Sequence, residues 1–82
     1  MSNWQENFSE RLRQVRLEKS LTMPELAEKI SKTKQAIDLF EKAKAKPSFD
    51  IFCDLAEILD VSLDYIAGRS DDPKIHKLRK KP

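Results

Sequence analysis

The chain of 82 residues carries a formal net charge of +2, with 37% charged residues and a single glycine. This length predicts one domain, and the composition is typical of an all-helical domain with solvated faces. The lone Cys53 excludes an internal disulfide, and no apolar run approaches the ~20 residues of a membrane-spanning helix. The first residues lack the basic and apolar regions of a signal peptide, so we expect a cytoplasmic protein.

The small net charge conceals an uneven distribution. Residues 29–47 contain six lysines against two acidic residues, whereas residues 48–72 contain one arginine against seven acidic residues. Residues 73–82 contain five basic residues and no acidic one. This pattern indicates one face for a polyanion and another face turned away from it.

Apolar residues at helical spacing predict a first helix, with Asn3 as its N-cap and Glu6 completing a capping box. Its inner face consists of Trp4, Phe8, Leu12 and Val15. We assign residues 1–7 to the start of this helix and residues 8–70 to the domain itself. Residues 71–82 form a basic tail with little core of its own, and we expect this tail to be disordered.

Two further N-caps predict a pair of short helices. Thr22 is followed three residues later by Glu25, with Pro24 in the first turn, and Thr33 begins a third helix that runs to about Lys42. The inner sides consist of Leu26, Ala27 and Ile30 in the second helix, and of Ala36, Ile37, Phe40 and Glu41 in the third. The outer side of the third helix consists of Lys34, Gln35, Asp38, Leu39 and Lys42. Two short helices joined by a tight break predict a helix-turn-helix over about residues 22–42.

Ser48 and Ser62 predict the starts of a fourth and a fifth helix, and Gly68 is placed to end the fifth. The expected inward residues are Phe49, Phe52, Leu55, Ala56 and Leu59 in the fourth helix, and Leu63 and Ile66 in the fifth. We see no internal repeat and no convincing strand.

The segment from Leu21 to Ser48, LTMPELAEKISKTKQAIDLFEKAKAKPS, resembles the Cro/CI-type (XRE-like) helix-turn-helix of phage repressors and bacterial regulators. The resemblance continues through Val61-Ser62-Leu63-Asp64 and Gly68-Arg69-Ser70-Asp71-Asp72-Pro73, and covers about residues 8–73. It implies a compact, all-α, five-helix lambda-repressor-like domain, a homodimer and a palindromic DNA site. It also implies an ion pair between Arg16 and Glu41. Ser31 and Ala43 stand where this family usually has glycine.

The outer side of the third helix would be free to enter the major groove, where base edges display distinct donors and acceptors. Gln35 can pair with adenine or remain a solvated surface residue. Asp38 can accept a hydrogen bond from cytosine, or it can pair with Lys42 within the helix. Leu39 can contact a thymine methyl group or a protein partner. The candidate DNA-binding residues are Thr22, Met23, Thr33, Lys34, Gln35, Asp38, Leu39, Lys44 and Lys46.

The residues around this motif favour contacts with the DNA backbone. Lys44 and Lys46 lie in a basic loop that can bind phosphates or simply remain solvated, and the helix that begins after Thr22 presents amides suited to phosphate. Outward apolar residues Ile58 and Tyr65 are candidates for a dimer interface.

The sequence thus predicts a DNA-binding transcriptional regulator, most simply a repressor that binds double-stranded operator DNA as a homodimer. The alternative is an antitoxin-like or other protein-interaction module on the same fold, whose partner is a toxin or another protein. We find no catalytic constellation, so we expect no enzymatic activity and no cofactor. His76 has no second ligand candidate near it in the sequence, so we expect no metal site.

Overall fold

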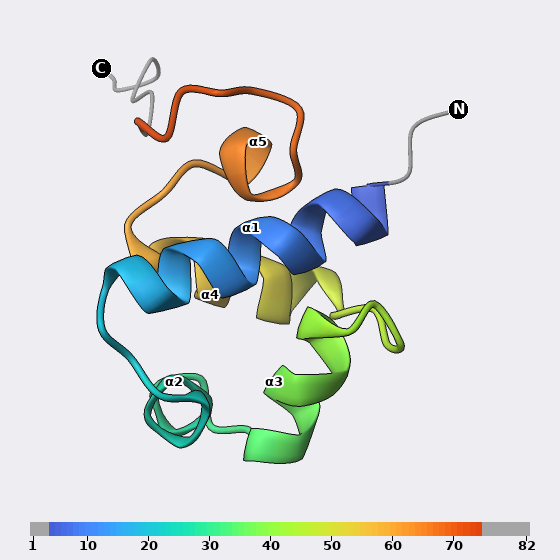
Figure 1. Cartoon of the computed structure of the whole chain (residues 1–82), viewed down its shortest axis with the longest axis vertical. Coiled ribbons are helices and arrows are strands. Elements are labelled where there is room, and N and C mark those ends of the chain that lie inside the picture. The colour runs from blue at the N-terminus through green and yellow to red at the C-terminus, as the bar shows by residue number, and fades with distance from the viewer. Residues whose placement is uncertain (1–3, 75–82) are drawn as a thin grey trace.

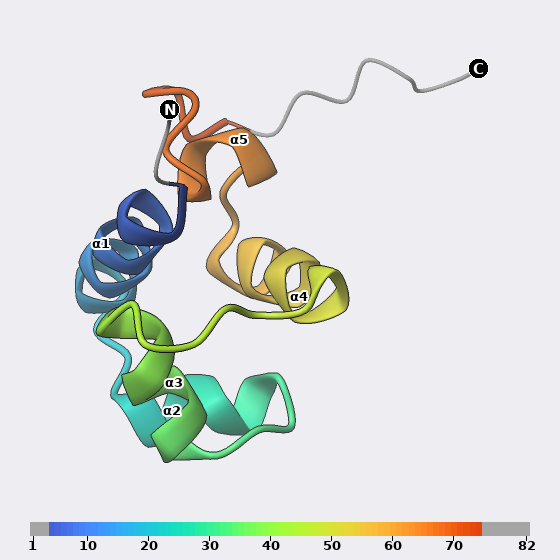
Figure 2. The ribbon, with the colours of Figure 1, turned by 90° about the vertical axis from the view of Figure 1, so that its right-hand side faces the viewer.

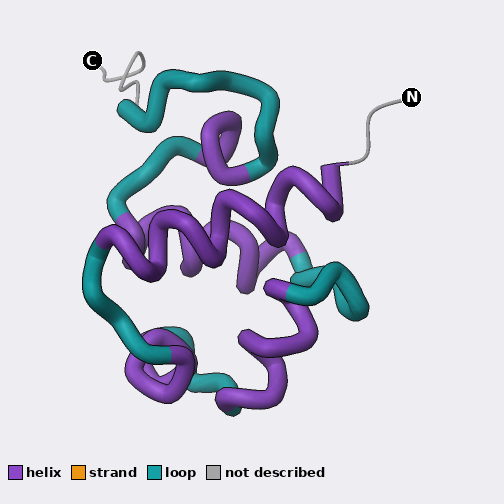
Figure 3. Tube along the Cα trace, viewed as in Figure 1, coloured by secondary structure: helices purple, strands orange, loops and turns teal. Residues whose placement is uncertain are grey.

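The computed structural model describes residues 4–74 and contains five helices in this range (Figures 1 and 3). They are α1 (Trp4–Glu18), α2 (Met23–Lys29), α3 (Lys34–Glu41), α4 (Phe49–Leu59) and α5 (Leu63–Ile66). Residues 4–74 form no strand, which confirms the expected all-α, five-helix fold. None of these helices combines the length and the apolar character that a membrane crossing requires. The expected cap Asn3 and the tail from residue 75 onward lie outside the described residues.

Helix α1 lies between α5 and the pair of α2 and α3 (Figures 1 and 2). It packs against α3 and α5, while α2 packs against α3, and α4 against α5. Two perpendicular views place α2 and α3 at one end of the molecule and α5 with the following segment at the other (Figures 1 and 2). The helix-turn-helix is therefore separated from the point at which the described chain ends.

One apolar core joins all five helices. Phe8, which is fully buried, lies at the centre of an aromatic cluster with Trp4, Phe40 and Phe52, whose ring centroids are 5.5 to 6.3 Å from its own. The other buried apolar side chains of this core are Leu12, Val15, Leu26, Ala27, Ile30, Ile37, Leu55, Ala56, Leu59, Val61 and Ile66. Burial of these side chains from helices far apart in sequence is the main driving force for folding.

Four helices begin at the hydroxyl N-caps that the sequence predicts. The side chains of Thr22, Thr33, Ser48 and Ser62 each accept a hydrogen bond from the backbone amide three residues later. Each such bond satisfies a donor that has no partner within its own helix, and typically contributes about 1 kcal/mol.

Each helix also ends in the same way, with one residue in the left-handed conformation. Gly68 follows α5 at φ 81°, whereas Ser20, Ser31, Ala43 and Asp60 hold φ values of 59–60° after the other four helices. At α3 the amide of Ala43 donates to the carbonyl of Phe40, and the amide of Lys44 donates to that of Leu39. Only one of these five left-handed positions has the residue type that adopts this conformation without a steric cost.

We expect Ala43→Gly to raise the free energy of unfolding by about 0.5–1 kcal/mol. The left-handed conformation costs a residue with a Cβ about 1–2 kcal/mol, and the greater flexibility of glycine in the unfolded chain offsets part of the gain. Urea unfolding followed by circular dichroism measures the change. The matched control is Ala45→Gly in the same loop, because Ala45 has no positive φ and should lose stability. Equal effects of the two substitutions would contradict the argument.

Two residues expected in the core are exposed. Phe49 is 71% exposed and Leu63 is 39% exposed, so the prediction that both point inward is wrong. Each is the first residue of its helix. A side chain in this position projects beyond the turns that the core covers, although it fits the apolar spacing of the helix.

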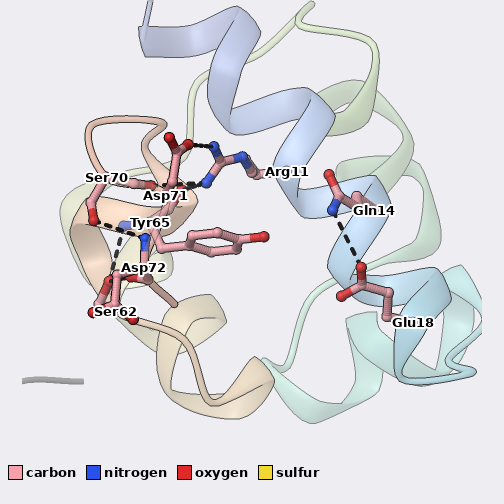
Figure 4. A network of polar contacts seen from close by, with 8 residues as sticks. All are labelled: Arg11, Gln14, Glu18, Ser62, Tyr65, Ser70, Asp71 and Asp72. Carbon is pink, nitrogen blue, oxygen red and sulfur yellow. Dashed lines mark hydrogen bonds and ion pairs between the residues drawn. The ribbon is translucent and has the colours of Figure 1, made fainter. Parts of the chain in front are cut away.

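Hydrogen bonding continues past residue 70, where we expect the domain to end. The guanidinium of Arg11 in α1 donates to the carbonyl of Ser70 at 3.1 Å and forms an ion pair with Asp71 at 2.9 Å (Figure 4). The amide of Ser62 donates to the carbonyl of Pro73 at 2.9 Å. Residues 71–73 are thus held against the domain rather than belonging to a separate tail.

Candidate DNA interface

The turn between α2 and α3 is short because the end of α2 and the start of α3 are both closed by local hydrogen bonds. The amide of Lys32 donates to the carbonyl of Ala27 at 2.9 Å, while Ser31 takes the left-handed conformation. Ala27 is 2% exposed, and its small side chain lies in the apolar core. The side chain of Lys32 is exposed, so its charge does not enter the core.

Helix α3 has one buried and one exposed side. Ile37 is fully buried and Phe40 is 7% exposed, and these two side chains anchor the helix in the core. Lys34 and Gln35 are exposed on the first turn, and Leu39 is 42% exposed one turn later. The exposed side therefore combines a cation, an amide and an apolar group, which are the side-chain types that contact phosphates, adenine edges and thymine methyl groups.

Asp38 lies beside this exposed side and is already paired. Its carboxylate forms an ion pair with the ammonium of Lys42, one turn later in α3, at 3.1 Å. The intrahelical pair of Asp38 with Lys42 is therefore present. A hydrogen bond from cytosine to Asp38 would require this ion pair to open, or the carboxylate to be shared between Lys42 and the base.

The start of α3 is better suited to a phosphate than the start of α2. At α2, the amide of Thr22 donates to the carboxylate of Glu25 at 2.8 Å, the amide of Glu25 donates to the Thr22 hydroxyl, and Pro24 has no amide hydrogen. The hydrogen bond from the Thr22 backbone lowers the pKa of Glu25. A charged carboxylate therefore occupies the place that an anion would take.

The first turn of α3 contains no acidic residue, and within residues 4–74 the amides of Lys34 and Gln35 have no intrachain acceptor. Thr33, exposed, caps this turn through the amide of Ala36. Lys44 and Lys46 are exposed in the loop that follows α3. Free amides thus lie at the start of α3, and exposed lysines lie near both of its ends, where they can hold the helix on the sugar–phosphate backbone.

Arg16 and Glu41 fix the orientation of α3 relative to α1. The Nε and Nη2 atoms of Arg16 donate to the two carboxylate oxygens of Glu41 at 2.6 and 3.1 Å, and the side chains are 9% and 3% exposed. The third nitrogen, Nη1, donates to the carbonyl of Leu21, just before α2. The hydrogen bond with Glu41 raises the pKa of Arg16 above its ordinary value. One guanidinium therefore joins α1, the start of α2 and α3.

The two dimer-interface candidates have different environments. Ile58 is 41% exposed on α4, whereas Tyr65 is half-buried beneath Arg11, whose Cζ atom lies 4.1 Å from the ring centroid (Figure 4). Arg11 also donates to the carbonyl of Tyr65 at 2.8 Å. Tyr65 is therefore not an outward apolar residue, because its ring packs against the core and carries a cation on one face.

Sequence reasoning did not identify Arg11 or the exposed ring of Phe49 as features of interest. Arg11 lies at an unremarkable position in α1, and its partners come more than 50 residues later. No pattern within the helix predicts such contacts. Among residues 4–74, no group of three or more histidine, cysteine, aspartate or glutamate side chains could hold a metal ion, and His76 lies outside this range.

Comparison with known proteins agrees with this arrangement. The sequence model described as helix-turn-helix matches residues 12–66. The chain is 46% identical over 66 residues to the uncharacterised HTH-type transcriptional regulator YobD of Bacillus subtilis (strain 168). It is 34% identical over 68 residues to the uncharacterised HTH-type transcriptional regulator YqaE of the same organism. The matches cover 80% and 83% of this chain but only 59% of each relative, so the chain spans about three fifths of their length. The chain therefore belongs to the XRE-type helix-turn-helix family.

Proposed function

We propose that the chain is a sequence-specific DNA-binding regulator that represses transcription by binding a palindromic operator as a homodimer. The observation that carries this proposal is the exposed side of α3, where Lys34, Gln35 and Leu39 are presented while Ile37 and Phe40 hold the helix in the core. The names of the relatives, both HTH-type transcriptional regulators, support the same class.

In this proposal α3 enters the major groove, and its first turn faces the base edges. Gln35 reads an adenine, Leu39 contacts a thymine methyl group, and Lys34 lies beside the backbone. Lys44 and Lys46 bind phosphates on one flank, and the amides at the start of α3 bind them on the other. Two copies related by a two-fold axis would read two half-sites ~34 Å apart on one side of the duplex.

The test is to footprint the protein on the DNA upstream of its own gene, and then to measure binding of the protected duplex by fluorescence anisotropy. We expect a protected palindrome that binds ~10³-fold or more tightly than a scrambled duplex, which is the low end of specificity for such proteins. Equal affinity for the two duplexes at physiological salt would contradict sequence-specific binding.

A second candidate function is that of an antitoxin-like module whose α3 binds a protein. The exposure of Leu39 on the outer side of α3 favours it, because an apolar side chain there suits a protein surface as well as a thymine methyl group. Substitutions on α3 that leave DNA binding unchanged would favour this candidate over the operator-binding one.

A further inference from the structure

The largest exposed apolar side chain among residues 4–74 belongs to Phe49, at the start of α4, and it stands beside a groove. Phe49 is 71% exposed, although burial of a phenylalanine is strongly favourable. The groove has a volume of about 390 Å³ and is lined by Trp4, Pro47, Phe49, Phe52, Ala67 and Arg69. The first residue of α1, the loop after α3, the start of α4 and the end of α5 therefore meet around one aromatic-lined depression.

The walls of this groove are held in place by the core. The rings of Trp4 and Phe52 pack edge to face at 5.8 Å, and both contact Phe8, which is fully buried. Pro47 is buried and fixes the loop that leads into α4. The surface that a binding partner meets is therefore preformed. Binding then requires little further ordering of these side chains, so the entropic cost to affinity is small.

The charges around Phe49 and the groove are complementary to each other. Asp50, exposed, follows Phe49 directly in α4, and Arg69, exposed, lies in the lining of the groove. Within residues 4–74 neither Asp50 nor Arg69 forms an ion pair. Phe49 and Arg69 line the same groove, so one patch combines an exposed ring, a cation and the anion that follows the ring in the chain. A patch that carries both charges and an exposed ring can pair with a copy of itself.

We propose that the occupant of this groove is a second copy of the chain, an inference that rests on the homodimer in the proposed function. In the dimer, Phe49 of one copy enters the groove of the other, and Asp50 of the first copy pairs with Arg69 of the second. The two-fold axis generates the same two contacts a second time, with Phe49 and Asp50 of the second copy meeting the groove and Arg69 of the first. Both subunits thus use the same patch. Phe49 is the anchor residue, a role that aromatic side chains in preformed pockets often fill.

This surface is distinct from the one that the sequence suggests. The ring of Tyr65 packs against the guanidinium of Arg11 within the same copy, and Ile58 does not line the groove. Phe49 begins α4 directly after the loop 42–48 that holds Lys44 and Lys46.

The experiment is sedimentation equilibrium of the full chain without DNA. We expect Phe49→Ala to raise the dimer dissociation constant by ~30-fold or more, the loss expected of an anchor residue. Ile58→Ala, also a truncation of an exposed apolar side chain on α4, should leave the constant within about threefold of the wild-type value. Because Phe49 is largely exposed, its removal should leave the melting temperature of the monomer almost unchanged, and this is checked by circular dichroism.

Charge reversal tests the pairing itself. Asp50→Arg and Arg69→Asp should each weaken the dimer by about tenfold, and the double variant should recover most of the lost affinity because it restores opposite charges across the interface. Additive weakening in the double variant would overturn the proposed pairing.

Other outcomes also overturn the inference. A wild-type chain that stays monomeric at high micromolar concentration, a Phe49→Ala variant that dimerises normally, or an Ile58→Ala variant that becomes monomeric would each do so. A monomeric wild-type chain would also contradict the homodimer of the proposed function, whereas a Phe49→Ala variant that dimerises normally overturns this inference alone. Failure of sequence-specific DNA binding is a separate result, because it appears as equal affinity of the wild-type protein for operator and scrambled DNA. Phe49→Ala should retain the exposed side of α3, and should therefore still bind a single half-site.

Discussion

Glu41→Ala should lower the free energy of unfolding by about 3–5 kcal/mol, the range measured when one partner of a buried ion pair is removed. The carboxylate of Glu41 is 3% exposed and accepts two hydrogen bonds from Arg16. Without it, a permanently charged guanidinium remains among apolar side chains with only the carbonyl of Leu21 as a partner. Urea unfolding followed by circular dichroism gives the change directly, and thermal melting should show a drop of roughly 4–8 °C for each kcal/mol.

The control is Glu57→Ala, because Glu57 is an exposed glutamate of α4. Removal of an exposed charge should change the free energy of unfolding by less than about 0.5 kcal/mol. A second variant, Arg16→Met combined with Glu41→Leu, should recover most of the stability, since apolar residues of similar volume avoid the cost of burying either charge. If Glu41→Ala and Glu57→Ala melted at the same temperature, Arg16 would not depend on Glu41 for its burial.

DNA binding should divide into a part that depends on salt and a part that depends on sequence, and different residues should carry the two parts. We expect Lys44→Ala or Lys46→Ala to weaken binding to operator and random duplexes alike. Each should also flatten the slope of log affinity against log salt by about one unit, because one phosphate fewer is neutralised. Gln35→Ala should instead lose about 1–3 kcal/mol on the operator alone and leave the slope nearly unchanged.

Fluorescence anisotropy over a salt series, with both duplexes and all three variants, separates these effects. Lys29→Ala serves as a matched control, since Lys29 is an exposed lysine at the end of α2 and outside both α3 and the loop after it. If Gln35→Ala weakened both duplexes equally, Gln35 would not be a base-reading residue. If none of the variants altered DNA binding, α3 would serve a protein partner, and the antitoxin-like candidate would replace the operator-binding one.

The sequence predicts those parts of this fold that are decided within one or two helical turns. Thr22, Thr33, Ser48 and Ser62 act as N-caps in the structure because a cap needs only its own hydroxyl and an amide three residues later. The inward positions Leu26, Ile37 and Leu55 follow from helical periodicity, and all three are fully buried.

The sequence does not predict those side-chain environments that depend on how one helix packs over another. Phe49 and Leu63 fit the apolar spacing of their helices, but no other element covers the first residues of α4 and α5. Tyr65 reads as outward because the sequence gives no indication that Arg11 lies above its ring. At the interface, by contrast, the sequence indicates which side of α3 faces outward, and it also offers the Asp38–Lys42 pair and the capping box of Thr22 with Glu25. Both interactions form, because each needs only residues within one helical turn.

The contacts of Arg11 with Ser70 and Asp71 determine where the chain leaves the domain. That exit lies at the end of the molecule opposite to α2 and α3 (Figures 1 and 2). A segment joined directly at residue 74 therefore begins away from the helix-turn-helix. An assembly or sensing module attached at residue 74 would start at the end of the molecule that α3 does not occupy.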